Sequence, residues 1–153
     1  MKPTQACGSP STDNLSPVQR SHAMRQVKSK NTKPELAARA AVRALGETGY
    51  RLHRADVAGR PDMVWIGRKL AIFINGCFWH GHSCARGARN PKTRAEFWRL
   101  KIARTIARDT RNHRLLTEEG WRVLVLWECE LRDSAALSSR LNDFFQGRRS
   151  ENE

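Results

Sequence analysis

The sequence is poor in acidic residues and has no long apolar segment. Its 153 residues include only 15 Asp and Glu against 28 Lys and Arg, which gives a formal net charge of +13. No run approaches the roughly 20 apolar residues that span a bilayer, and the N-terminus lacks the apolar stretch of a signal peptide. We therefore expect a cytoplasmic chain without a membrane partner.

The excess of basic residues favours a polyanion as partner. Basic side chains that neutralise phosphates release counterions, and this release favours binding. A domain as basic as this one indicates nucleic acid more strongly than a merely soluble surface. The length fits one domain with a core of its own.

Cysteine is also scarce, with only Cys7, Cys77, Cys84 and Cys129. Four cysteines could form two disulfides, but a cytoplasmic chain keeps its thiols reduced. The cysteines near histidines are therefore more typical of a metal site than of disulfides.

Three regions differ in composition. Residues 1–17 are rich in Pro, Ser, Thr and Asn and predict a disordered tail. Residues 18–33 form a basic arm, including Met24, Arg25 and Val27, that we expect to contact DNA. The arm opens a domain of residues 18–146, and residues 147–153 form a second disordered tail.

Periodicity predicts an α/β domain with the order α-β-β-β-α-β-α. A helix capped by Thr32 runs to about residue 45 with Leu36, Ala40 and Ala44 on its apolar stripe. Strands are expected at 50–54, 63–66, 70–74 and 121–127, and further helices at about 94–118 and 134–145. In the long helix, Ile102, Ile106 and Leu116 should face inward. A right-handed crossover makes the last strand parallel to the third, in a mixed sheet.

A turn crowded with metal-binding side chains follows the third strand. Cys77, His80, His82 and Cys84 fall within eight residues, and Cys129 follows the last strand. Three thiolates and one imidazole suit tetrahedral zinc, whereas the alternative is a set of buried thiols. One histidine suffices for zinc, which leaves the other available as an acid or base.

Two carboxylates suggest a second metal. Asp62 stands after Pro61 at a strand entrance, and Glu35 lies in the first turn of the first helix. Mg²⁺ needs few protein carboxylates because water and substrate phosphate complete its shell. Alone, Asp62 would be a turn residue and Glu35 a partner of the helix dipole. Together they resemble the nuclease pattern in which a Pro-Asp at a strand entrance binds a metal over an αβββαβ core.

Aromatic side chains surround the same turn. Phe78 and Trp79 lie within it, and Phe97 and Trp98 follow at the start of the long helix. Apolar wedges between base steps are one use of such rings. We favour this use for Phe78 and Trp79, and for Trp98 core packing and wedging remain equally open.

These motifs together resemble one family, the very short patch repair (Vsr) DNA mismatch endonucleases. The resemblance extends from about residue 20 to residue 145. It is carried by Gly59-Arg-Pro-Asp62, Gly76-Cys-Phe-Trp-His80, Glu96-Phe-Trp98, Lys101-Ile102, Arg108-Asp109, Gly120-Trp-Arg-Val and Trp127-Glu-Cys129.

The resemblance implies a restriction-endonuclease-like αβββαβ core with a structural Zn²⁺ and a catalytic Mg²⁺. The implied reaction is hydrolysis of the strand 5′ to the thymine of a T·G mismatch, which arises when 5-methylcytosine deaminates. The implied partner of the monomeric enzyme is double-stranded DNA, and recruitment by other mismatch-repair proteins stays open. A bacterial protein of this kind is expected at the nucleoid.

The resemblance also assigns residues to roles. Asp62 and the carbonyl of Ile74 would bind Mg²⁺, His80 would activate water or assist the leaving group, and Glu35 would support the site. Zn²⁺ would be held by Cys77, His82, Cys84 and Cys129. The wedge would be formed by Phe78, Trp79 and Trp98, and the positions near the mismatched pair are Met24, Val27 and Lys101.

The sequence departs from the family pattern at Ile74, Asn75 and Thr105. Asn75 replaces a second catalytic histidine of some members, and an amide can orient a water but cannot take its proton. Two alternative functions follow. One is a zinc-stabilised DNA-binding module with a decayed nuclease site, and the other is a restriction-type nuclease without mismatch preference.

Overall fold

The computed structural model describes residues 16, 18–19, 21–22, 30–89, 91–92 and 94–147. Its three-stranded sheet consists of β1 (Met63–Trp65), β2 (Leu70–Asn75) and β3 (Arg122–Trp127) in that order. β1 pairs antiparallel with β2, and β3 runs parallel to β2. The predicted mixed α/β fold is confirmed.

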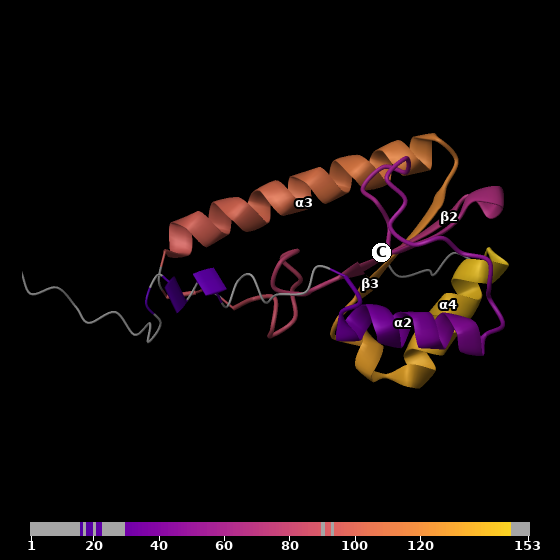
Figure 1. Ribbon diagram of the computed structural model, residues 1–153, viewed down its shortest axis with the longest axis horizontal. Coiled ribbons are helices and arrows are strands. Elements are labelled where there is room, and N and C mark those ends of the chain that lie inside the picture. The colour runs from indigo at the N-terminus through magenta and orange to yellow at the C-terminus, as the bar shows by residue number, and fades with distance from the viewer. Residues whose placement is uncertain are drawn as a thin grey trace, which may run out of the picture.

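Helices cover both faces of this sheet. α2 (Lys33–Ala44) and α4 (Ser134–Gln146) lie on one face, and α3 (Ala95–Glu118) crosses the other (Figure 1). Two short 3-10 turns, η1 (Ile66–Arg68) and η2 (Glu130–Arg132), follow β1 and β3. Among the described helices, none is long and apolar enough to cross a membrane.

Alternation along the strands divides the core into two layers. The side of α2 and α4 buries Met63 and Ile72 with Val42 and Leu141. The opposite side buries Val64, Ala71 and Phe73 with Leu116 of α3. Because neighbouring strand residues point to opposite faces, a sheet covered on both faces needs the near-continuous apolar runs that β1 and β2 show.

The start of α2 is built as the sequence predicts. The Thr32 side chain accepts a hydrogen bond from the Glu35 N–H, and Pro34 lies in the first turn. The buried face of this helix differs from the prediction, because it consists of Glu35, Ala38, Arg39 and Val42. Leu36 is 50% exposed. An ion pair between Glu35 and Arg39 allows two charged side chains to replace the expected apolar stripe.

The strand predicted at 50–54 is wrong. Only one isolated bridge forms there, between Arg51 and Val64. His53 ends the extended conformation because its φ is +47°, a left-handed value that breaks the pleat of a strand.

The long helix α3 also differs from the prediction at one position. It begins at Ala95 and ends at Glu118 as expected, but Ile106 is 43% exposed instead of facing the core. This part of α3 faces the loop after β2, where a Cβ on Gly81 would lie 2.7 Å from Ile106 Cδ1. α4 buries Leu137, Leu141 and Phe144.

Candidate active site and metal centre

Asp62 lies directly before β1, next to the buried Pro61. The Ile74 N–H of β2 donates to Asp62 Oδ2 over 2.7 Å, which fixes the carboxyl group against the sheet. Burial raises the pKa of Asp62 to about 6, and the nearby charge of Glu35 adds to this effect while the bond from Ile74 opposes it. A cation would stabilise the charged form of this partly buried carboxylate.

Glu35 is held by three neighbours at the start of α2. Oε1 accepts from the Thr32 hydroxyl over 2.9 Å. Oε2 accepts from the Asn31 N–H over 2.9 Å and from Arg39 Nη2 over 3.0 Å. The Thr32 and Glu35 pair resembles a capping box, except that the carboxylate accepts from the N–H of Asn31, one residue before the N-cap. The carboxylate that faces the site therefore also stabilises the start of the helix.

His53 joins Glu35 and Asp62 in one group, which sequence reasoning missed. The ligand atoms of these three side chains all lie within 4.8 Å of one another and could hold a metal ion. Burial lowers the pKa of His53, which favours the neutral ring. The only sequence signal was a lone histidine inside a predicted strand, and the wrong strand assignment concealed it.

His80 is oriented by α3. Its Nδ1 lies 2.6 Å from Asp109 Oδ2, and Arg108 donates to the other oxygen of Asp109 over 2.8 Å. Because a carboxylate only accepts, Nδ1 carries the proton and Nε2 is free to accept one. The sequence analysis noted Asp109 in the motif Arg108-Asp109, but it did not predict the contact of Asp109 with His80.

Asn75 ends β2 and is almost fully buried. Its carbonyl accepts the Glu128 N–H over 3.0 Å, and it pairs in register with Trp127. Cys77 and Cys129 each lie two residues beyond this last pair. Parallel strands end at the same edge of a sheet, so the register itself brings the two cysteines together.

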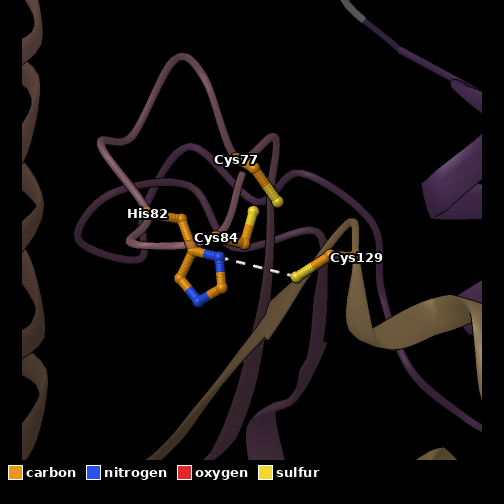
Figure 2. A group of neighbouring side chains, drawn as sticks. All are labelled: Cys77, His82, Cys84 and Cys129. Atoms are coloured by element: carbon orange, nitrogen blue, oxygen red, sulfur yellow. Dashed lines mark hydrogen bonds between the residues drawn. The ribbon is translucent and has the colours of Figure 1, made fainter. Parts of the chain in front are cut away.

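Cys77, His82, Cys84 and Cys129 form the second group that could hold a metal ion (Figure 2), with all ligand atoms within 4.8 Å of one another. His82 Nδ1 lies 3.5 Å from Cys129 Sγ. Between the two candidate histidines, the structure places His82 in this group and His80 against Asp109.

The surroundings of these four residues suit a cation. The His82 ring stacks on Trp127 with centroids 4.3 Å apart. The Gly87 N–H and His82 lower the pKa of the Cys84 thiol to about 6, whereas burial and the neighbouring thiols raise that of Cys129 to about 12. A bound cation would favour the thiolate form at both positions.

Gly87 closes the loop that carries these ligands. A Cβ at this position would lie 1.9 Å from the His82 carbonyl oxygen and 3.0 Å from that of Cys77. Any side chain would therefore push the backbone of two ligand residues away. The sequence showed the glycine but not this contact.

The aromatic residues of the turn lie together outside the two core layers. The ring centroids of Phe78, Trp79 and Trp98 are 5.1 to 5.6 Å apart. Lys101 Nζ lies 5.1 Å from the Trp98 ring and 5.5 Å from the Trp79 ring. Trp79 is 37% exposed. A cation held over partly exposed rings can meet both a phosphate and a base.

Several positions predicted from the sequence contribute no contact to the site among the described residues. Met24, Arg25 and Val27 lie outside the described residues, as do most of the two tails. Thr105 is part of α3, where its hydroxyl donates to the Lys101 carbonyl over 3.1 Å.

The fold and site first define a class of protein. A mixed sheet with a carboxylate at the entrance of β1 and a parallel β3 reached through α3 is a restriction-endonuclease-like arrangement. Similarity to known proteins then identifies one family within this class.

Residues 12–86 match the family model of the DNA mismatch endonuclease Vsr. The type II nicking enzyme V.XorIIP of Xanthomonas oryzae pv. oryzae is 49% identical over 86% of this chain and 96% of its own length. V.NmeAIP, a type II nicking enzyme of Neisseria meningitidis, is 41% identical over 86% of this chain and 92% of its own. The DNA mismatch endonuclease Vsr of Escherichia coli is 38% identical over 84% of each chain. The chain belongs to the Vsr family of DNA mismatch endonucleases, which hydrolyse DNA.

Proposed function

We propose that this protein nicks one DNA strand 5′ to the thymine of a T·G mismatch that arises from 5-methylcytosine deamination, in very short patch repair, by Mg²⁺-dependent hydrolysis. The observation that carries the proposal is that a carboxylate suited to a metal, Asp62, and an imidazole suited to proton transfer, His80, are each held in place by a hydrogen bond. Asp62 is only 18% exposed and is fixed by Ile74, and His80 is held by Asp109.

Asp62 and the carbonyl of Ile74 would hold Mg²⁺, because both oxygens are hard ligands. When bound, this ion would stabilise the charge that develops on the scissile phosphate. The bond from the Ile74 N–H turns one oxygen of Asp62 toward the strand and leaves the other for the ion. Glu35, whose charge acts on Asp62, would support this metal site.

His80 acts as the general base or acid in this proposal. Asp109 holds Nδ1, so that Nε2 can take a proton from the attacking water or return one to the leaving oxygen. Asn75 can orient the water but cannot accept its proton. His80 therefore carries the proton transfer without a second histidine at position 75.

The mismatch would be recognised by the aromatic group. Phe78, Trp79 and Trp98 would enter the base stack, since a mismatched step costs less to unstack than a paired one. Lys101, over two of these rings, would neutralise a phosphate. Met24, Val27 and Lys101 would lie near the mismatched pair, and Arg25 would contact the DNA from the basic arm.

Zn²⁺ is the metal that best suits the other group, because three thiolates and one imidazole are a usual structural zinc set. The four ligands Cys77, His82, Cys84 and Cys129 come from the loop after β2 and from the end of β3. A closed set of four leaves no position for substrate, so its role would be to hold the aromatic turn in place.

The role of His80 is tested by a nicking assay on a T·G duplex. We expect His80→Ala to lower the rate by about 100-fold or more, the usual contribution of a general base, and Asp109→Asn to shift the pH profile. Thr110→Ala, on the exposed side of the same helix, is the control. Zinc content and melting temperature should not change, and a near-normal rate in His80→Ala would refute the assignment.

A further inference from the structure

His53 lies between the two carboxylates of the active site. Its Nε2 is 3.6 Å from Glu35 Oε2, and its Nδ1 is 3.8 Å from Asp62 Oδ1. Both nitrogen atoms of one ring thus face an acidic oxygen. The imidazole is 19% exposed, and its backbone, with φ at +47°, turns it inward from the loop before β1.

Glu35 is poorly placed to bind a metal itself. Both of its oxygens already accept hydrogen bonds, from Thr32, Asn31 and Arg39. It is well placed to orient His53. Arg39 Nη2 lies closer to Glu35 Oε2, at 3.0 Å, than to His53 Nε2, at 3.5 Å, so the guanidinium bonds mainly to the carboxylate. Glu35 Oε2 lies 3.6 Å from His53 Nε2, and a small approach of the ring would let this oxygen accept from it.

Asp62 has one oxygen to spare. Oδ2 accepts from the Ile74 N–H, which leaves Oδ1 facing His53 Nδ1. Two ligand atoms about 2.1 Å from one octahedral ion lie about 3 Å apart. The observed 3.8 Å separation therefore needs only a small shift for both atoms to reach one ion.

We propose that His53 Nδ1 is a ligand of the active-site metal beside Asp62, and that Glu35 orients the ring by accepting from Nε2. Metal-binding histidines commonly donate their other N–H to a carboxylate, which fixes the ring and the tautomer. The inference rests on the proposed metal-dependent hydrolysis. It adds a nitrogen donor to a site otherwise made of oxygen.

A nitrogen ligand has a consequence for metal choice. Imidazole suits first-row transition ions, whereas Mg²⁺ prefers oxygen ligands and keeps several waters. The site should therefore bind Mn²⁺ more tightly than Mg²⁺, and His53 should be the reason.

The test is a Mn²⁺ titration of the full-length, zinc-loaded protein, with free Mn²⁺ counted by electron paramagnetic resonance and Mg²⁺ affinity obtained by competition. The variant is His53→Asn, because asparagine tolerates a left-handed φ and its amide oxygen remains a hard donor. His113→Asn, which removes a half-buried histidine whose ring lies tilted against Phe73, is the matched control.

We expect His53→Asn to raise the Mn²⁺ dissociation constant by about 10-fold or more and that of Mg²⁺ by less than about threefold. The control should bind both ions like the wild type. Unchanged Mn²⁺ binding, or equal losses for both ions, would overturn the inference. A wild type that shows this His53-dependent binding but never nicks a T·G duplex would refute the proposed function and not the ligand.

Discussion

Glu35 accepts hydrogen bonds from Asn31, Thr32 and Arg39 while it faces Asp62. One buried side chain thus ties down the start of α2 and neutralises a buried guanidinium, and in the proposed mechanism it also supports the site. Loss of activity on mutation would not by itself show a catalytic role, because the start of the helix would also lose these hydrogen bonds.

Glu35→Ala should lower the free energy of unfolding by about 3–5 kcal/mol, since removal of one partner leaves Arg39 buried and unpaired. Urea unfolding at pH 7 measures this change. Glu118→Ala removes an exposed glutamate that pairs with Arg114, and this control should change stability by less than about 0.5 kcal/mol. A similar small effect at Glu35 would show that the buried pair contributes little.

Asp62 predicts a pH dependence in the absence of Mg²⁺. Its pKa rises from an ordinary 3.8 to about 6 on folding, so the folded chain holds a proton that the unfolded chain releases between these values. Stability from this group therefore falls as pH rises through that window, by about 3 kcal/mol in all.

Asp62→Asn escapes this loss because the amide does not ionise. We expect the variant to be more stable than the wild type by about 3 kcal/mol at pH 8 and by about half as much at pH 5, although it should not nick DNA. Denaturant unfolding at the two pH values tests the difference. An advantage that is absent, or equal at both pH values, would contradict the assigned cause.

At the scale of elements, the parallel pairing of β2 and β3 decides where the candidate metal ligands meet. Cys77 and Cys129 lie at equal distances beyond the paired residues Asn75 and Trp127. The loop that completes the set depends on Gly87, over which the backbone of His82 passes closely.

Gly87→Ala should therefore release the proposed zinc at roughly 10-fold lower chelator concentration, because a Cβ cannot fit beside the His82 carbonyl. A colorimetric zinc assay with increasing chelator measures this release. Gly67→Ala serves as control, since nothing lies within 4 Å of a Cβ there. Equal zinc retention in both variants would mean that the loop can adjust.

The sequence predicted most elements because their periodicity follows from burial on both faces of the sheet. It failed where local geometry prevailed. The left-handed φ of His53 cut short the strand at 50–54 and concealed a third member of the Glu35 group. Because Glu35 and Arg39 pair with each other, α2 likewise buries a face that contains both, and apolar periodicity did not indicate that face. Contacts between distant side chains, such as His80 with Asp109, have no signal in composition or spacing.

At the scale of the whole molecule, helices on both faces of the sheet carry candidate site residues. α2, which carries Glu35, and α4 close the main core on one face, and α3 crosses the other (Figure 1). Trp98, Lys101 and Asp109 belong to α3. One helix thus supplies both the partner of His80 and part of the aromatic group. With a net charge of +13, the chain should bind DNA of any sequence, driven by counterion release, before it recognises a mismatch.

The most direct measurement is a strand-labelled nicking assay on duplexes that contain T·G in varied sequence contexts, with Mg²⁺, for the wild type and Asp62→Ala. Matched T·A and C·G duplexes are the controls. We expect a Mg²⁺-dependent nick 5′ to the mismatched thymine in the wild type and none in the variant. T·G duplexes that are bound but never cut would contradict the account and favour a decayed site, and equal cutting of matched DNA would favour a nuclease without mismatch preference.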